Sequence, residues 1–289
     1  MMNFEILKDV SLKNYCTFRI GGNAKFLFVS KTNTQLVNVC KHCELHNIKY
    51  KVIGFGANLL FDDLGYDGMI IVNTSNKVLF NNNFVIADGG VNVTSLIMKC
   101  YLRSLSGLEN LMGIPSTIAG AVVNSLGAFG TNFSDFVEHI ECYHKNDLTR
   151  KLKLNHDDCN FGYRTSIFKN DEYVITKIKL KLKFDDKTLI EQRIKAAIEK
   201  KCSTQPLNKP SAGSVFKRKD LIPAKVIDEL GLKGTTIGGA EISTKHAGFI
   251  INTHSATSQD VKDLMSFIQK QVREHYNEDL EPEIEFVEY

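Results

Sequence analysis

Hydrophobic and lysine residues alternate strictly over residues 177–184, within the strand-like segment 175–184. Ile178, Leu180, Leu182 and Phe184 alternate with lysines at positions 177, 179, 181 and 183. Successive side chains of a strand point to opposite faces of its sheet, so this period of two predicts a strand with one face on a core and the other in water. We interpret the lysines as the solvated face of that strand rather than as a basic binding patch.

Weaker patterns predict further helices and strands. Apolar positions at helical spacing indicate helices over residues 33–47, 92–102, 187–203, 221–230 and 258–277. Short β-rich runs indicate strands over residues 25–30, 49–53, 69–72, 83–87 and 282–287. Pro206 and Pro210 mark a loop or linker, and the change from strands to helix near residue 186 indicates a domain boundary. The class is therefore mixed α and β.

Composition excludes several classes of protein. Hydrophobic residues make up 43% of the 289 residues and charged residues 24%, which is typical of a folded globular chain. The 36 Lys and Arg nearly balance the 33 Asp and Glu, so we expect no nucleic-acid partner. Apolar runs such as residues 69–72 are far shorter than a membrane span, and residues 1–5 lack the layout of an export signal. We therefore expect neither membrane insertion nor export.

The seven cysteines indicate reduced thiols rather than a disulfide framework, because their number is odd and their spacing irregular. Cys40, His42, Cys43 and His46 lie close enough in sequence to suggest zinc. No second pair of ligands with finger-like spacing follows. We therefore favour a packed amphipathic helix at this segment and expect no metal site.

A first glycine-rich segment follows the predicted strand at 49–53. Gly54 and Gly56, followed by Ala57 and Asn58, allow a tight turn that directs backbone N–H groups at an anion such as a pyrophosphate. The segment is not the dinucleotide fingerprint, because Leu59 stands at the third glycine position. Taken alone, the segment is weak evidence and favours a plain turn over phosphate binding.

A second segment of small residues covers positions 113–130. Small side chains let the backbone approach a flat or phosphorylated ligand closely, and Ser116 or Thr117 is suited to cap a short helix. The alternative is a packed helix and turn without a ligand.

Three further segments carry reactive or charged side chains. Arg164 lies among aromatic residues and is suited to bind a carboxylate or phosphate, or to stack at the surface. Ser214 lies among small residues beside Lys217 and Arg218, without the spacing of a hydrolase nucleophile elbow. Glu283 places a carboxylate early on the predicted terminal strand.

Taken together and in this order, these segments resemble the UDP-N-acetylenolpyruvoylglucosamine reductase (MurB) family of peptidoglycan precursor synthesis. The resemblance begins at Cys-Thr-Phe-Arg-Ile-Gly-Gly, residues 16–22, and continues to Glu283, so it covers nearly the whole chain. Ala57, where the family usually has serine, and the pair Ser125-Leu126 depart from the family pattern. None of these departures touches Arg164, Ser214 or Glu283.

The resemblance implies an α+β fold with a vanillyl-alcohol-oxidase-type FAD-binding unit. Its two subdomains would cover residues 1–75 and 76–186, and an α+β substrate domain would cover residues 187–289, with the terminal strand returning towards the first subdomain. The length resembles the shorter type II branch. The implied FAD-binding residues are Gly54, Gly56, Ala57, Asn58, Leu59, Gly113, Ile114, Pro115, Ser116, Thr117, Gly120, Ala121, Asn124 and Gly127.

The resemblance also implies the reaction. NADPH would reduce FAD, and the flavin would pass hydride to the enolpyruvyl ether of UDP-N-acetylglucosamine, giving UDP-N-acetylmuramate in cell-wall biogenesis. Arg164 and Glu283 would stabilise the enolate, and Ser214 would donate the proton. Tyr163, Lys217 and Arg218 would contact the substrate. We expect a cytoplasmic monomer. The alternatives are another FAD-dependent oxidoreductase of the same superfamily and a non-catalytic flavin- or nucleotide-sugar-binding protein.

Overall fold

The computed structural model describes residues 5–289, so residues 1–4, on which part of the export-signal argument rests, lie outside it. The chain divides into two compact units. Unit 1 consists mainly of residues 27–54 and 68–200, and unit 2 of residues 7–26, 55–67 and 201–289. Each unit therefore combines segments that are distant in sequence. The three-domain division at residues 75/76 and 186/187 stays a prediction.

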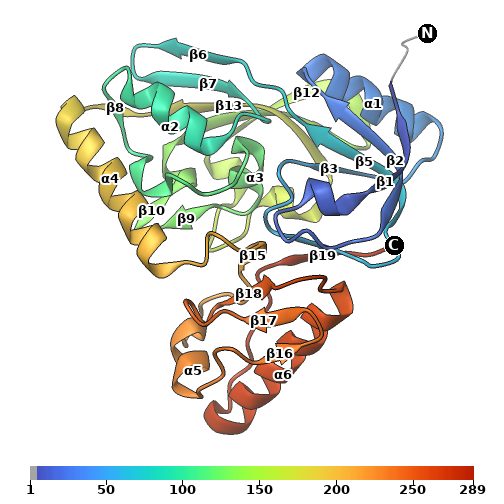
Figure 1. Cartoon of the computed structure of the whole chain (residues 1–289). Helices are drawn as coiled ribbons and strands as arrows, with labels where there is room; N and C mark the ends of the chain where they lie inside the picture. Colours follow the sequence, from blue (N-terminus) through green and yellow to red (C-terminus); the bar gives the residue numbers. More distant parts are fainter. Residues whose placement is uncertain (1–4) are drawn as a thin grey trace. The chain divides into compact units, whose positions relative to one another are not determined.

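Unit 1 carries most of the elements, and β2 (Asn23–Ser30), β5 (Tyr66–Asn73) and α4 (Lys187–Thr204) each carry residues of both units (Figure 1). Its helices are α1 (Asn33–Leu45), α2 (Val93–Tyr101) and α3 (Ile118–Val123), with short 3-10 turns at Glu109–Leu111, Phe133–Phe136, Asp157–Cys159 and Ile167–Asn170. Its strands are β3 (Tyr50–Ile53), β6 (Val78–Asn81), β7 (Phe84–Asp88), β8 (Leu105–Ser106), β9 (Gly127–Ala128), β10 (Thr131–Asn132), β11 (Val137–His144), β12 (Asp147–Asn155), β13 (Tyr173–Lys181) and β14 (Lys183–Phe184).

The main sheet of unit 1 has the strand order β12-β11-β13-β7-β6 with every neighbour antiparallel. Its central strand β13 is the predicted alternating strand. Ile178 and Leu180 are fully buried, whereas Lys177 and Lys179 are partly exposed and Lys181 is exposed. The prediction of one core face and one solvated face is confirmed for residues 177–182, whereas Phe184, predicted to face the core, lies after β13 and is 64% exposed.

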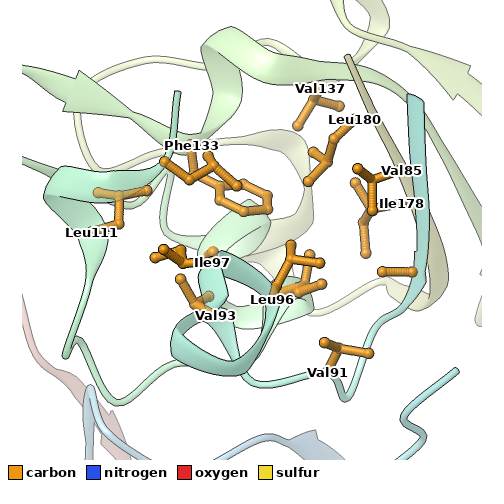
Figure 2. Close-up of a cluster of buried hydrophobic side chains, with 14 of the residues drawn as sticks. Val85, Val91, Val93, Leu96, Ile97, Leu111, Phe133, Val137, Ile178 and Leu180 are labelled. Carbon is orange, nitrogen blue, oxygen red and sulfur yellow. The ribbon is translucent and has the colours of Figure 1, made fainter. Parts of the chain in front are cut away.

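A large apolar cluster packs the helices α2 and α3 against this sheet (Figure 2). Val93, Leu96 and Ile97 of α2 belong to it together with Phe133, which is fully buried. Asn92 caps α2 by accepting a hydrogen bond from the Ser95 N–H at 3.0 Å. This packing fixes the segment that connects β7 to α3.

The cysteine pair of α1 lies inside the protein. Cys40 and Cys43 are fully buried, and Cys43 Sγ lies 3.6 Å from Met69 Sδ. Burial raises the pKa of the Cys43 thiol to about 12, which disfavours the thiolate that a metal would need. The segment is a packed helix, as favoured above. Among residues 5–289, no cluster of three or more His, Cys, Asp or Glu side chains is arranged to hold a metal ion.

Unit 2 contains a second, antiparallel sheet with the order β15-β18-β17-β16. The amphipathic helix α6 packs on β16 and β17 (Figure 1). Ser258 at its start donates from N–H and hydroxyl to the Asp63 carboxylate, both at 2.8 Å. The elements of this unit are β1 (Leu7–Ser11), a 3-10 turn at Leu12–Tyr15, β4 (Leu59–Phe61), β15 (Ser211–Ser214), α5 (Pro223–Glu229), β16 (Thr236–Ile237), β17 (Ala240–Ile242), β18 (Phe249–Asn252), α6 (Ser258–Tyr276) and β19 (Glu285–Val287).

The terminal strand β19 pairs in parallel with β4, with Glu285 opposite Leu59. It is shorter than the predicted strand, because Pro282 forms only an isolated bridge with Phe216. Within residues 5–289, no helix is both long enough and apolar enough to cross a membrane.

Candidate active site

The two glycine-rich segments meet inside unit 1 at Gly54. A Cβ atom added to Gly54 would lie 2.4 Å from Thr117 Oγ1, so no larger residue fits there without a shift. Thr117 caps α3, as the sequence predicted for this residue or Ser116, because its hydroxyl accepts from the Gly120 N–H at 3.2 Å. These contacts place Gly54 directly against the start of the second glycine-rich segment.

Gly56 makes the next part of the first loop possible. Its φ of +59° is left-handed, and a Cβ there would lie 2.4 Å from the Tyr15 carbonyl oxygen. Asn58 then donates from Nδ2 to the Glu283 carbonyl at 3.0 Å, and Leu59 opens β4. No helix follows this loop, in agreement with the sequence argument against a dinucleotide fingerprint.

The second segment is held by the chain that follows β7. The Ile118 N–H donates to Val91 O at 2.8 Å, and the Ala119 N–H donates to Gly89 O at 2.9 Å. Gly113 has a φ of +79° and donates from N–H to Thr94 Oγ1 at 3.1 Å. Of the remaining predicted residues, Ile114, Pro115 and Ser116 lie between Gly113 and α3, and Ala121 is fully buried within α3.

Two buried amides of unit 1 indicate a polar ligand. Asn124 Oδ1 and Asn73 Nδ2 are buried and have no hydrogen-bond partner within the described part of the chain. Leaving such a group unpaired costs about 1–3 kcal/mol, so both atoms fit a ligand rich in donors and acceptors. Asn73 was not predicted from the sequence. Asn73 Nδ2 would lie 3.3 Å from a Cβ atom built on Gly89. The two residues are 16 positions apart, so no local motif reveals this contact.

Arg164 lies against the end of the second segment. Its guanidinium donates from Nη2 to Gly127 O at 3.0 Å and from Nη1 to Ser125 O at 3.5 Å. Tyr163 stacks beside it, with the guanidinium carbon 5.4 Å from the ring centroid, and is itself 56% exposed. Arg164 has a φ of +55°, which is unfavourable for a residue with a Cβ and therefore marks a position held by its surroundings. The structure thus joins Arg164 to Gly127, one of the predicted FAD-binding residues.

Ser214 and Glu283 come together in unit 2. Ser214 ends β15, and the carbonyl of the next residue, Val215, accepts from the Glu283 N–H at 2.8 Å. Lys217 N–H donates to Glu281 O at 2.8 Å on the same pair of segments. The predicted proton donor and the predicted carboxylate therefore lie on hydrogen-bonded neighbouring segments.

The cations beside Ser214 are paired with an acidic residue that the sequence argument did not single out. Lys217 Nζ forms an ion pair with the Glu281 carboxylate, and Lys219 Nζ lies 2.7 Å from the other oxygen. The hydrogen bond from Lys217, followed by that from Lys219, lowers the pKa of the Glu281 carboxyl to about 2. Arg218 lies between these two lysines in the chain, in the loop after β15.

Comparison with known proteins defines first the class and then the family. The sequence model of the FAD binding domain matches residues 24–150, so the chain is a flavoprotein. The model of the UDP-N-acetylenolpyruvoylglucosamine reductase C-terminal domain matches residues 205–287.

Whole-chain relatives extend this assignment. The reductase of this name from Pseudothermotoga lettingae is 36% identical over 97% of both chains, and that from Caldicellulosiruptor bescii is 38% identical over 98% of this chain and 91% of its own. The crystal structure of the enzyme from Thermus caldophilus superimposes with a TM-score of 0.83 at 30% identity and covers 99% of both chains. The chain belongs to the UDP-N-acetylenolpyruvoylglucosamine reductase family, which confirms the predicted family and α+β class.

Proposed function

We propose that this chain reduces the enolpyruvyl ether of UDP-N-acetylglucosamine to UDP-N-acetylmuramate with NADPH, as a step of peptidoglycan precursor synthesis. The observation that carries the proposal is that Ser214 and Glu283 lie on segments joined by the 2.8 Å bond from Glu283 N–H to Val215 O, in a chain of this family. A protein that only bound a flavin would not require a hydroxyl and a carboxyl at this pairing.

The residues present fit FAD. The close backbone at Gly54 and Gly56 and the unpaired amide oxygen of Asn124 are suited to a ligand with a pyrophosphate and a polar ring edge. Bound FAD supplies a carrier that accepts hydride from NADPH and passes it to the substrate. Ala57 offers no hydroxyl to the pyrophosphate, so the contacts here would come from backbone N–H groups.

Arg164 would bind the substrate carboxylate. Its guanidinium stays charged at every working pH and presents planar donors that match a carboxylate. The carbonyls of Gly127 and Ser125 hold it in place before substrate arrives. As negative charge moves from the double bond onto the carboxylate, a fixed cation stabilises the enolate more than it stabilises the substrate, which lowers the barrier.

Ser214 would donate the proton that completes the reduction. A serine hydroxyl is a weak acid, so this role depends on close placement and on the strong basicity of the enolate carbon. Glu283 would hydrogen-bond the enolate in its protonated form, because an ionised carboxylate would repel it. Lys217, Arg218 and Tyr163 would contact the rest of the anionic substrate. For Lys217, this requires sharing its ammonium group with Glu281.

The same proposal includes a cytoplasmic, monomeric enzyme that takes NADPH and a UDP-sugar as substrates. It is tested by recording the visible spectrum of the purified protein and then following NADPH oxidation with and without the enolpyruvyl sugar nucleotide. We expect a flavin spectrum and NADPH oxidation that depends on the sugar nucleotide. Colourless protein that gains no colour with FAD would contradict the proposal, and NADPH oxidation independent of the sugar would favour another flavin oxidase.

A further inference from the structure

Asn58 is hydrogen-bonded to the segment around Glu283 through both its side chain and its main chain. Nδ2 of Asn58 donates to Glu283 O at 3.0 Å, and the Asn58 carbonyl accepts from the Glu285 N–H at 2.8 Å. The second bond is part of the parallel ladder between β4 and β19, which starts with Glu285 opposite Leu59. The side-chain bond extends that ladder back to Glu283, which lies before the strand begins.

The other side of Glu283 is held by the Ser214 segment. The Glu283 N–H donates to Val215 O at 2.8 Å, so both polar groups of its main chain have fixed partners. Ile284 is only 4% exposed and anchors the next position in the core. Because successive side chains of an extended chain point to opposite faces, these anchors determine the face to which the Glu283 carboxyl points.

The bond from Asn58 requires a hydrogen-bond donor on a short side chain, because the strand ladder already fixes the distance between the two main chains. Aspartate has the same shape but no donor when ionised, and alanine has no polar group. A residue that served only the flavin pyrophosphate would have no reason to direct its amide at a carbonyl 225 positions away in the chain.

We propose that Asn58 is a positioning residue for Glu283, which links the first glycine loop to the carboxyl that stabilises the enolate. This inference rests on the proposed function. It predicts that loss of the amide slows the step that uses Glu283 more than it slows hydride transfer from NADPH to the flavin.

The test compares Asn58→Ala with Asn83→Ala in the FAD-loaded protein. Asn83 is a matched control, since it is also half-buried and donates its amide to a distant carbonyl, Leu182 O, at 2.8 Å. At saturating FAD, we expect Asn58→Ala to slow oxidation of the reduced enzyme by the enolpyruvyl sugar about tenfold to a hundredfold. Flavin reduction by NADPH should slow clearly less than this, since Asn58 also belongs to the predicted FAD-binding loop, and Asn83→Ala should change neither step.

Hydrogen–deuterium exchange of residues 280–287 gives a second readout that does not depend on turnover. We expect faster exchange there in Asn58→Ala and unchanged exchange in Asn83→Ala. Equal slowing of both half-reactions, or unchanged exchange, would overturn the inference. If Asn58→Ala does not fold, Asn58→Asp removes the donor at constant size and serves instead. If the wild type does not turn over the sugar nucleotide, the proposed function fails, whereas the exchange result still decides whether Asn58 holds Glu283.

Discussion

The catalytic role of Ser214 can be tested separately from its structural role, because replacement by alanine leaves β15 and the pairing of position 214 with Phe249 in place. We expect Ser214→Ala to keep flavin reduction by NADPH and to lose product formation by about 10²–10⁴-fold, the usual contribution of a proton donor. Stopped-flow measurement of the two half-reactions checks this. Ser266→Ala, on the surface of α6, is the control. Equal loss in both half-reactions would show that Ser214 is not the proton donor.

Two substitutions of Glu283 show whether the enolate needs a hydrogen bond from this side chain or its negative charge. If the enolate needs a neutral donor, Glu283→Gln should stay within about tenfold of the wild type in product formation, because the amide N–H replaces the acid O–H. Glu283→Ala should lose about 10²–10³-fold, as when one donor to a developing oxyanion is removed. Rates of oxidation of the reduced enzyme by substrate check this. Equal loss in the two variants would mean that the negative charge is required.

At the scale of elements, the loop between β3 and β4 depends on one left-handed glycine. Gly56→Ala adds a Cβ 2.4 Å from Tyr15 O, whereas Gly231→Ala adds one at a similar φ of +67° with no atom within 4 Å. Gly231→Ala should cost only the backbone term of about 1 kcal/mol. Gly56→Ala must also displace backbone, so we expect it to lower the melting temperature further and to weaken FAD binding. Thermal denaturation and FAD titration check this, and equal effects would contradict the tight contact.

The pairing of the β15 loop with the segment before β19 depends on Glu281 and should be sensitive to acid. The folded-state pKa, about 2, lies below the ordinary value of 4.5, so the stabilisation is complete above about pH 4.5 and is lost as the pH falls towards 2. Because the carboxyl is 40% exposed, Glu281→Gln should lower the melting temperature by only about 1–3 °C at pH 7, and the difference should vanish at low pH. Melting curves from pH 2 to 7 check this. A constant difference would exclude the ion pairs as its cause.

The sequence predicted elements where the hydrophobic period is intact. The helices α1, α2, α4 and α6 lie within two residues of their predicted bounds, because each buries one regular stripe. β11 was missed because its pairing with β13 shifts between Val137 and His139, which interrupts the alternation of its side chains. β18 was missed because all of its residues, Phe249–Asn252, are buried, so no alternation exists to detect.

The motifs likewise identified residues but not their partners. Gly54 and Thr117, and Arg164 and Gly127, were selected separately from the sequence, and only the fold shows that they touch. Glu281 and Asn73 could not be selected, because their importance lies in contacts with residues that are distant in sequence or not part of any motif. Local composition defines the backbone geometry of a loop, whereas contacts such as Asn58 with Glu283 depend on chain topology.

At the scale of the whole molecule, unit 2 is assembled from three separate stretches of chain, residues 7–26, 55–67 and 201–289. The first two stretches supply Leu12, Phe18 and Phe61, which are fully buried. They also bond directly to the third, since Asn252 Nδ2 donates to Phe18 O at 3.2 Å and Asp63 caps α6. The sequence boundary at residue 187 and the contacts of unit 2 therefore make different predictions for an isolated fragment.

A fragment of residues 187–289 tests whether the chain folds as an independent domain from residue 187 or needs the earlier stretches of unit 2. It lacks β4, so β19 has no partner strand, and it lacks Leu12, Phe18 and Phe61, which are fully buried in the intact chain. Burial of one such side chain contributes about 1.5–3 kcal/mol, so the loss of three approaches the whole stability of a small domain. We expect no cooperative urea transition by circular dichroism, in contrast to the full chain under the same conditions. A cooperative transition in the fragment would show that residues 187–289 fold as an independent domain, because their own sheet and α6 would then suffice to form its core.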